Sequence, residues 1–211
     1  HDFGTRTTNE IEKDLLNFSK ERKMELILPS LYSELEGDAL PNIVDEISKT
    51  KYLDHIIVGL DKANENQAKK AWKFFKKLKT PFSLLWNDGP ELKKLDKELK
   101  KKDLAPSELG KGRNVWYCIG MSIARNTARS VALHDCDIKT YDRRMLAKLF
   151  YPVVNPLFNF EFCKGYYPRV AEGKMNGRVA RLLVFPLLTA LEKTIGKGDY
   201  LDFMKSFKYP L

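Results

Sequence analysis

Cysteine and histidine are scarce in this chain, which has three residues of each among its 211. The cysteines are scattered, at Cys118, Cys136 and Cys163, without the paired spacing of a zinc site or a disulfide framework. A histidine-rich metal centre is excluded because so few histidines are present. An odd, unpaired set of thiols is typical of reduced cysteines, so we expect a cytoplasmic location.

Long hydrophobic runs are also absent. No stretch approaches the roughly 20 apolar residues that a membrane-spanning helix needs, so we expect no membrane partner. Residues 1–8 lack the apolar segment of a secretory signal. Hydrophobic residues make up 43% of the chain and charged residues 31%, which is the composition of a folded domain rather than of a disordered segment.

Acidic residues are outnumbered by basic ones, 28 to 37, and the formal net charge is +9. This balance favours anionic partners such as nucleic acids, acidic lipids or phosphorylated small molecules. The lysine clusters have helical spacing beside apolar residues, so we interpret them as solvated helix faces and expect no nucleic-acid partner. The clusters are Lys69 with Lys70, Lys76 with Lys77, and the stretch 93–102.

Short apolar runs alternate with amphipathic segments over the first 151 residues. The alternation predicts an α/β fold, with a parallel sheet and right-handed crossovers. The expected strands are 24–28, ended by Pro29, then 55–60, 82–86 and 131–133. The expected helices are 9–20, 38–49, 65–79, 91–101, 114–127 and 141–151. In the helix 114–127 we expect Trp116, Ile119, Ile123 and Ala124 to face inward.

The last quarter of the chain has a different pattern. Alternation over 161–167 is typical of a half-buried strand. The apolar segment 179–195 predicts a helix, which Pro186 should kink or interrupt. Gly177 and Arg178 come just before that helix, where free backbone N–H groups and a guanidinium can bind phosphate. Arg178 could equally form a surface ion pair.

The stretch Ser130–Asp137 carries the principal candidate site. A short buried strand, 131–133, delivers Asp135 and Asp137 at its C-terminal end. Ligands of open α/β sheets bind at that edge. Two carboxylates one residue apart can hold Mg²⁺ or Mn²⁺, and the cation can hold a diphosphate. The alternative is a solvated strand end or a helix N-cap.

A second candidate is Gly110-Lys111-Gly112. Two glycines around a lysine let the backbone approach an anion closely while the ammonium neutralises it. An exposed lysine in a flexible turn would have the same sequence. The spacing of a P-loop is absent.

Taken in order, five segments resemble the glucosyl-3-phosphoglycerate synthase family, which are retaining glycosyltransferases of GT-A fold. The resemblance covers roughly residues 24–190. The segments are Leu28, Pro29, Ser30 and Leu31 with Glu34; Asp61; Gly110, Lys111 and Gly112; His134 to Ile138; and Phe162 to Tyr167 running on to Gly177, Arg178 and Val179.

The resemblance implies a role for each matching position. A donor nucleotide would be bound by residues of four segments, and the metal by Asp137. The phosphate of 3-phosphoglycerate would be bound by Gly177, Arg178 and Val179. In the implied donor site, the nucleoside pocket is lined by Pro29, Ser30, Leu31 and Glu34, and Asp61 lies near the base or ribose. Lys111 lies beside the base or diphosphate, Asp135 at the ribose or sugar, and Cys136 and Asp137 beside them. The implied catalytic residues are Asp135 and Asp137.

The implied activity is transfer of glucose from a nucleoside diphosphate sugar, UDP-glucose, to 3-phosphoglycerate or glycerate with retention of configuration. This activity requires Mg²⁺ or Mn²⁺ and is a step in the synthesis of glucosylglycerate, a compatible solute. The expected form is a homodimer. We expect an N-terminal helical extension over 1–22, a nucleotide-sugar half over 23–140, and an acceptor half over 141–211 that is incomplete at its C-terminus. The family has a threonine after its Gly-Arg-Val triplet, where this chain has Ala180, and a further histidine ligand downstream of Leu211.

Three alternatives remain open at this point. Mannose could be transferred from GDP-mannose to a similar acceptor. A nucleotidyltransferase would also use carboxylates at a strand end, Mg²⁺ and a basic loop. A non-catalytic module that binds nucleotides or nucleic acid would account for the charge of +9 without any special role for Asp137.

Overall fold

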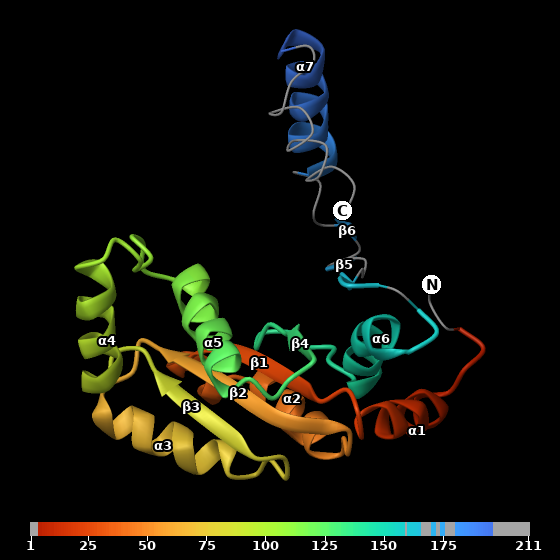
Figure 1. Ribbon diagram of the computed structural model, residues 1–211, viewed down its shortest axis with the longest axis horizontal. Helices are drawn as coiled ribbons and strands as arrows, with labels where there is room; N and C mark the ends of the chain where they lie inside the picture. The colour runs from red at the N-terminus through yellow and green to blue at the C-terminus, as the bar shows by residue number, and fades with distance from the viewer. Residues whose placement is uncertain (1–3, 159, 166–169, 172–173, 176–179, 196–211) are drawn as a thin grey trace. The chain divides into compact units, whose positions relative to one another are not determined.

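The computed structural model describes residues 4–158, 160–165, 170–171, 174–175 and 180–195 (Figure 1). The chain divides into two compact units, His1–Cys163 and Lys164–Leu211. The first unit is an α/β domain that contains all of the expected donor-site residues. The second contains the expected acceptor residues. The three-part division made from the sequence stays a prediction.

The first unit is built on a four-stranded parallel sheet with the strand order β3-β2-β1-β4. Figure 1 shows this sheet with helices on both of its faces. The four strands expected from the sequence are all present, and the predicted α/β class is confirmed. Their bounds are β1 Met24–Leu31, β2 Leu53–Asp61, β3 Phe82–Trp86 and β4 Ser130–Leu133.

Strand β1 does not end at Pro29 as expected, because it continues to Leu31. Pro29 pairs with Gly59 of β2 on one side. On the other side the pairing with β4 stops at Ile27, which is opposite Leu133. Proline has no N–H for a ladder, but it is tolerated where a strand has an edge. The strand therefore runs four residues beyond Ile27, its last residue paired with β4.

Three helices of the first unit, α1, α3 and α6, begin at a residue whose side chain caps the helix. Thr7 and Glu10 form a reciprocal capping box at the start of α1, and Asn64 and Gln67 form one at the start of α3. The helices are α1 Thr8–Phe18, α2 Ala39–Ser48, α3 Glu65–Phe75, α4 Pro90–Lys100, α5 Lys111–Arg125 and α6 Arg143–Val154, and a short 3₁₀ turn, η1 Tyr32–Glu36, follows β1.

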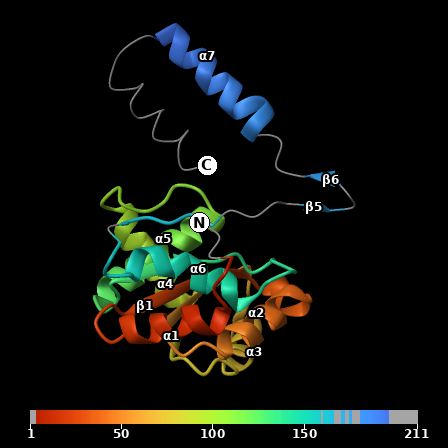
Figure 2. The ribbon, with the colours of Figure 1, turned by 90° about the vertical axis from the view of Figure 1, so that its right-hand side faces the viewer.

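One side of the sheet is closed by α1, α2, α3 and α6, whose apolar residues form a single large core cluster with the strands. We call this the closed side. Figure 2 shows α1, α2 and α3 together in the lower part of the first unit. The N-terminal helix belongs to this core, since Ile11 and Leu15 are fully buried. Arg6 and Asp14 tie it to Tyr151 of α6, with the Arg6 Nη1 to Tyr151 Oη distance at 2.7 Å.

The other side of the sheet carries α5, and we call it the open side. Its buried apolar cluster is small, made of Ile27, Ile57 and Cys118. The expectation that apolar residues of α5 face inward is wrong, because polar and small residues face the sheet instead. The buried residues of α5 are Asn114, Tyr117, Cys118 and Ser122, whereas Trp116, Ile119, Ile123 and Ala124 are exposed.

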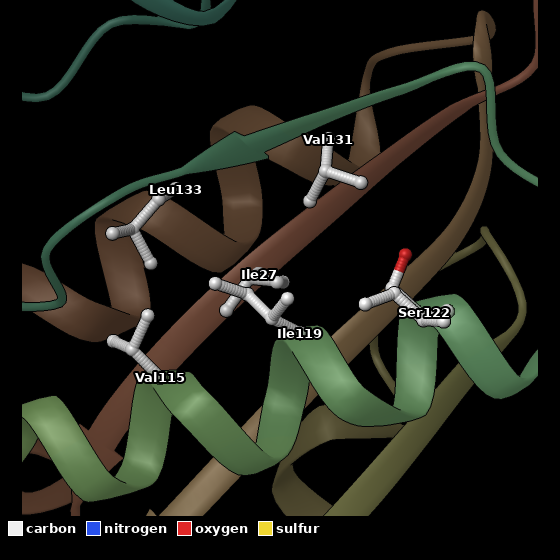
Figure 3. Close-up of a pocket in the computed structure, with 7 residues that line it drawn as sticks. Ile27, Val115, Ile119, Ser122, Val131 and Leu133 are labelled. Carbon is white, nitrogen blue, oxygen red and sulfur yellow. The ribbon is translucent and has the colours of Figure 1, made fainter.

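Between α5 and β4 the open side has an apolar hollow of about 240 Å³ (Figure 3). Val131 and Leu133 face it from β4, whose alternate residues, Ser130 and Ala132, are buried. Isoleucines of β1 and α5 complete the lining. The lining residues are Ile27, Val115, Ile119, Ser122, Ile123, Val131 and Leu133.

The second unit contains a hairpin of β5 Val170–Ala171 and β6 Lys174–Met175, then a π-helical turn η2 Ala180–Val184 and helix α7 Phe185–Ile195. The expected interruption is confirmed, since the π turn ends one residue before α7, and Pro186 lies in the first turn of α7. The expected strand 161–167 is not formed over residues 161–165. None of the described helices has the length and apolar content needed to cross a membrane.

Candidate functional site

The topology brings three expected site segments to one edge of the sheet. Leu31 at the end of β1 pairs directly with Asp61 at the end of β2. Asp135 follows β4, the other neighbour of β1. All four strands are parallel, so their carboxyl ends lie at this single edge. This is the edge at which α/β sheets bind ligands.

The end of β1 has a conformation held by its own side chains. Glu34 accepts a hydrogen bond from the backbone N–H of Leu31 at 3.0 Å. The hydroxyl of Ser30 is buried and donates to the carbonyl of Leu31 at 3.0 Å. These contacts fold the chain back from Pro29 through η1. The carboxylate of Glu34 is therefore engaged in shaping the loop, whose residues 29–34 remain at the edge.

Asp61 is oriented by a residue that the sequence analysis did not single out. The amide nitrogen of Asn87 donates to Asp61 Oδ1 at 2.8 Å, and the Asn87 backbone N–H donates to the carbonyl of Leu60 at 2.9 Å. Asn87 itself is buried. The sequence did contain a signal for this contact. Asp61 is the last residue of β2 and Asn87 directly follows β3, so in a parallel sheet the two residues lie at the same edge.

Lys111 and Asp135 meet at the same edge. The ammonium of Lys111 donates to Asp135 Oδ1, and the two side chains are 56% and 38% exposed. An ion pair this exposed adds little stability. Lys111 is the first residue of α5, directly after Gly110, which has a φ of 134° that only glycine adopts without strain. The arrangement places a cation, a carboxylate and a helix N-terminus together.

The residues around Asp135 differ sharply in burial. Burial raises the pKa of the Cys136 thiol, which makes it unreactive. His134 is buried with its ring 5.3 Å from that of Tyr141, and burial lowers its pKa to about 4. Its ring lies in the interior beside Tyr141, away from solvent. Asp137 is exposed.

The fit to a metal ion rests on Asp137. Within the described part of the chain its carboxylate has no hydrogen bond or ion pair, so its oxygens are free to bind a hard cation. The same part of the chain has no group of three or more His, Cys, Asp or Glu side chains that could hold a metal. Asp137 therefore fits as a single oxygen ligand, and the described residues do not supply a complete ligand set.

The expected acceptor residues, Gly177, Arg178 and Val179, lie outside the described residues. The structure thus brings four of the predicted site elements to one edge of the sheet: the end of β1, Asp61, Lys111 and Asp135. Their assignment as a donor site stays a prediction.

Comparison with solved structures defines the class of fold. The fold resembles that of the glucosyl-3-phosphoglycerate synthase of Mycobacterium tuberculosis in complex with Mn²⁺, UDP and glucosyl-3-phosphoglycerate, with a TM-score of 0.51 and 19% identity over 88% of this chain and 56% of that one. Its complex with Mn²⁺, UDP-glucose and phosphoglyceric acid gives a TM-score of 0.54 at 19% identity, over 87% and 55%. The predicted GT-A type of α/β fold is confirmed.

Curated relatives narrow the resemblance. The chain is 43% identical over 209 residues to the glucosyl-3-phosphoglycerate synthase of Persephonella marina, which is 99% of this chain and 52% of that protein. It is 36% identical to the enzyme of the same name from Methanococcoides burtonii, over all of this chain and 52% of that protein. No family model matches. The resemblance to the glucosyl-3-phosphoglycerate synthases is confirmed, and the chain spans about half the length of these relatives.

Proposed function

We propose that the protein acts in transferring a glucosyl group from UDP-glucose to 3-phosphoglycerate or glycerate with retention of configuration. The observation that carries the proposal is the juxtaposition of Lys111 and Asp135 at the carboxyl edge of the sheet. It gains support from the 43% identity to a glucosyl-3-phosphoglycerate synthase and from the Mn²⁺, UDP-glucose and phosphoglyceric acid in the similar solved structures.

The nucleoside would lie against the end of β1 and beside Asp61. The backbone from Pro29 to Leu31 is held by Glu34 and would line one wall of the pocket. Asp61 Oδ1 is taken by Asn87, which leaves Oδ2 to accept a hydrogen bond from the ribose or the base. Because Asn87 is buried and bonded to the backbone of β2, this carboxylate is held before a ligand arrives.

The diphosphate would bind between Lys111 and Asp137. As the glycosidic bond breaks, negative charge develops on the leaving phosphate, and the ammonium of Lys111 would stabilise it. Mg²⁺ or Mn²⁺ bound to Asp137 would supply additional charge neutralisation at the diphosphate. Asp135 would accept a hydrogen bond from the ribose or the sugar, and its present bond to Lys111 keeps both side chains at the site.

The acceptor would be held by Gly177, Arg178 and Val179 through its phosphate or carboxylate. Retention is consistent with attack on the face from which the nucleotide departs, with the leaving phosphate oxygen taking the proton of the acceptor hydroxyl. The proposal includes a homodimer and a role in making glucosylglycerate as a compatible solute.

Calorimetric titration tests the donor part of the proposal. UDP-glucose and GDP-mannose are titrated into the protein with Mg²⁺, with Mn²⁺ and with chelator. We expect metal-dependent binding of UDP-glucose. Preferential binding of GDP-mannose would instead indicate mannosyl transfer, and release of pyrophosphate rather than UDP on turnover would indicate a nucleotidyltransferase.

The matched variants are Asp137→Ala and Glu98→Ala. Glu98 is an exposed carboxylate on α4 paired only with Lys101 in the described structure, so its removal changes the net charge equally. We expect Asp137→Ala to abolish metal-dependent binding and Glu98→Ala to leave it unchanged. Tight metal-dependent binding retained by Asp137→Ala would contradict the assignment.

A further inference from the structure

A buried carboxylate on α4 binds two side chains from the first turns of α5. Asp96 is the one described residue of α4 that is buried. Its Oδ1 accepts a hydrogen bond from the Tyr117 hydroxyl at 2.5 Å and lies 3.2 Å from Arg113 Nη2. Its Oδ2 lies 2.8 Å from the ammonium of Lys100. Hydrogen bonds from Lys100 and then Tyr117 lower the pKa of Asp96 to about 2, so the carboxylate is ionised at neutral pH.

The two α5 partners of Asp96 lie one helical turn apart, at positions i and i+4. The guanidinium of Arg113 also stacks over the ring of Tyr117, with 5.3 Å from its central carbon to the ring centroid. One carboxylate therefore holds two stacked side chains on the same face of α5. Arg113 is the second residue after Lys111, so the grip acts within the turn that carries the proposed phosphate-binding ammonium.

That turn has little else to hold it. A Cβ added to Gly110 or Gly112 would meet nothing within 4 Å, so both glycines beside Lys111 lie in open space. The segment 101–110 that leads into α5 contains no helix or strand. A second tie is the amide of Asn114, which donates to the carbonyl of Gly59 at 2.9 Å. Backbone freedom at the two glycines makes the position of Lys111 depend on these side-chain ties.

We propose that Asp96 is a positioning residue for the donor site: by holding Arg113 and Tyr117 it fixes the first turn of α5 and keeps Lys111 opposite Asp135. The inference rests on the proposed function, since it concerns how that site binds a nucleoside diphosphate. Asp96 itself would not touch the nucleotide. Its effect passes through α5.

The test variant is Asp96→Asn, which keeps the size of the side chain and an acceptor for Tyr117 but removes the charge that holds Arg113. Its matched control is Lys100→Met, which removes a partner of Asp96 from the exposed side of α4 without touching α5. UDP affinity is measured by calorimetry with Mn²⁺, and amide hydrogen exchange is followed over residues 114–118. In a substrate assay the KM for UDP-glucose is compared with kcat.

We expect Asp96→Asn to weaken UDP binding about tenfold, because displacement of a binding group by about 1 Å has effects of this order or larger. Exchange over 114–118 should accelerate by about the same factor. Asp96→Asn makes the net charge more positive by one, and this change alone would strengthen the binding of an anion such as UDP. A loss of UDP affinity therefore cannot come from the change in net charge and indicates displacement of Lys111. Lys100→Met should change neither quantity more than about twofold.

A double-mutant cycle with Lys111→Ala separates positioning from general destabilisation. If Asp96 acts through Lys111, Asp96→Asn should cost almost no further UDP affinity in the Lys111→Ala background. Equal losses in both backgrounds would overturn the inference, as would UDP affinity within twofold of the original protein in Asp96→Asn. Failure of the proposed function is recognised separately, because the unaltered protein would then not bind UDP.

Discussion

The two sides of the sheet are held together by different forces. On the closed side, four helices bury apolar side chains in one large cluster. On the open side, α5 buries few apolar groups and is attached by polar bonds along its length. Asn114 donates to the carbonyl of Gly59, and Ser122 Oγ and Arg125 Nε donate to Glu25 at 2.6 and 2.9 Å.

The polar attachment determines position more sharply than apolar packing does. The hydrophobic effect is non-directional, so apolar contact fixes the position of a helix only through the shape complementarity of the packed side chains. Hydrogen bonds to buried groups require defined distances and angles, and a buried acceptor left without its donor costs about 1–3 kcal/mol. Glu25 is fully buried on β1, so the register of α5 over the sheet is specified. The helix that presents Lys111 is the one that is held this way.

The two sides can be compared most directly by truncating two neighbouring residues of β1, for which we expect the largest losses in the free energy of unfolding. Leu26 is fully buried on the closed side, and Ile27 is buried on the open side, where it lines the hollow. We expect Leu26→Ala to lower the free energy of unfolding by about 3–5 kcal/mol and Ile27→Ala by about 2–3 kcal/mol, since the space left at Ile27 merges with an existing hollow. Urea unfolding measures both, and equal losses would show that the two sides are packed alike.

The next effect concerns the closed side at low pH. Burial against Tyr141 lowers the pKa of His134 to about 4, below its value of about 6.5 in the unfolded chain. The unfolded state then binds more protons between these values, so stability falls as the pH drops through that window. The loss is roughly 3 kcal/mol by pH 4. His134→Gln should flatten the pH dependence of urea midpoints between pH 7 and 4, and an unchanged profile would contradict the assignment.

Two glycines test the attachment of α5. A Cβ at Gly59 would lie 1.7 Å from Asn114 Oδ1 and 2.6 Å from Cys118 Sγ, whereas one at Gly120 would meet nothing within 4 Å. We expect Gly59→Ala to destabilise the protein by about 1–3 kcal/mol through overpacking. Gly120→Ala should stabilise it by about 0.5–1 kcal/mol, because alanine favours the helix interior. A tolerated Gly59→Ala would mean that α5 does not approach β2 closely.

The sequence was sufficient to predict the parallel sheet of the first unit and the edge of that sheet at which the candidate residues lie. Each strand that was expected by its apolar run is present, because buried parallel strands need continuous apolar residues on both faces. The positions of Asp61 and Asp135 then followed from parallel topology alone. The contact between Lys111 and Asp135 required α5 to begin at Lys111, between the two glycines, and not at the expected residue 114. Gly110 and its positive φ made this earlier start possible.

The sequence misled at α5 for a physical reason. Its apolar residues, Trp116, Ile119 and Ile123, have the periodicity of a buried face, and hydrophobicity alone assigns that face to the core. The sheet beneath α5 instead presents Glu25 and the carbonyl of Gly59, which bind polar side chains. These hydrogen-bond partners are far apart in the sequence, so no local sequence pattern indicates that they meet. The same holds for the links from Asp96 to Tyr117 and from Asn87 to Asp61.

The smallest expected effect lies at the most exposed apolar residue of α5, on the rim of the hollow. Ile123 is 71% exposed, and we expect Ile123→Gln to change the free energy of unfolding by less than about 0.5 kcal/mol. Chemical denaturation with urea is again the measurement, and Leu26→Ala provides the scale. A loss of more than about 1.5 kcal/mol would break the comparison, because a side chain that matters this much must be covered in solution. The exposed apolar face of α5 would then be a packed surface, and the open side would differ from the closed side only in what covers it.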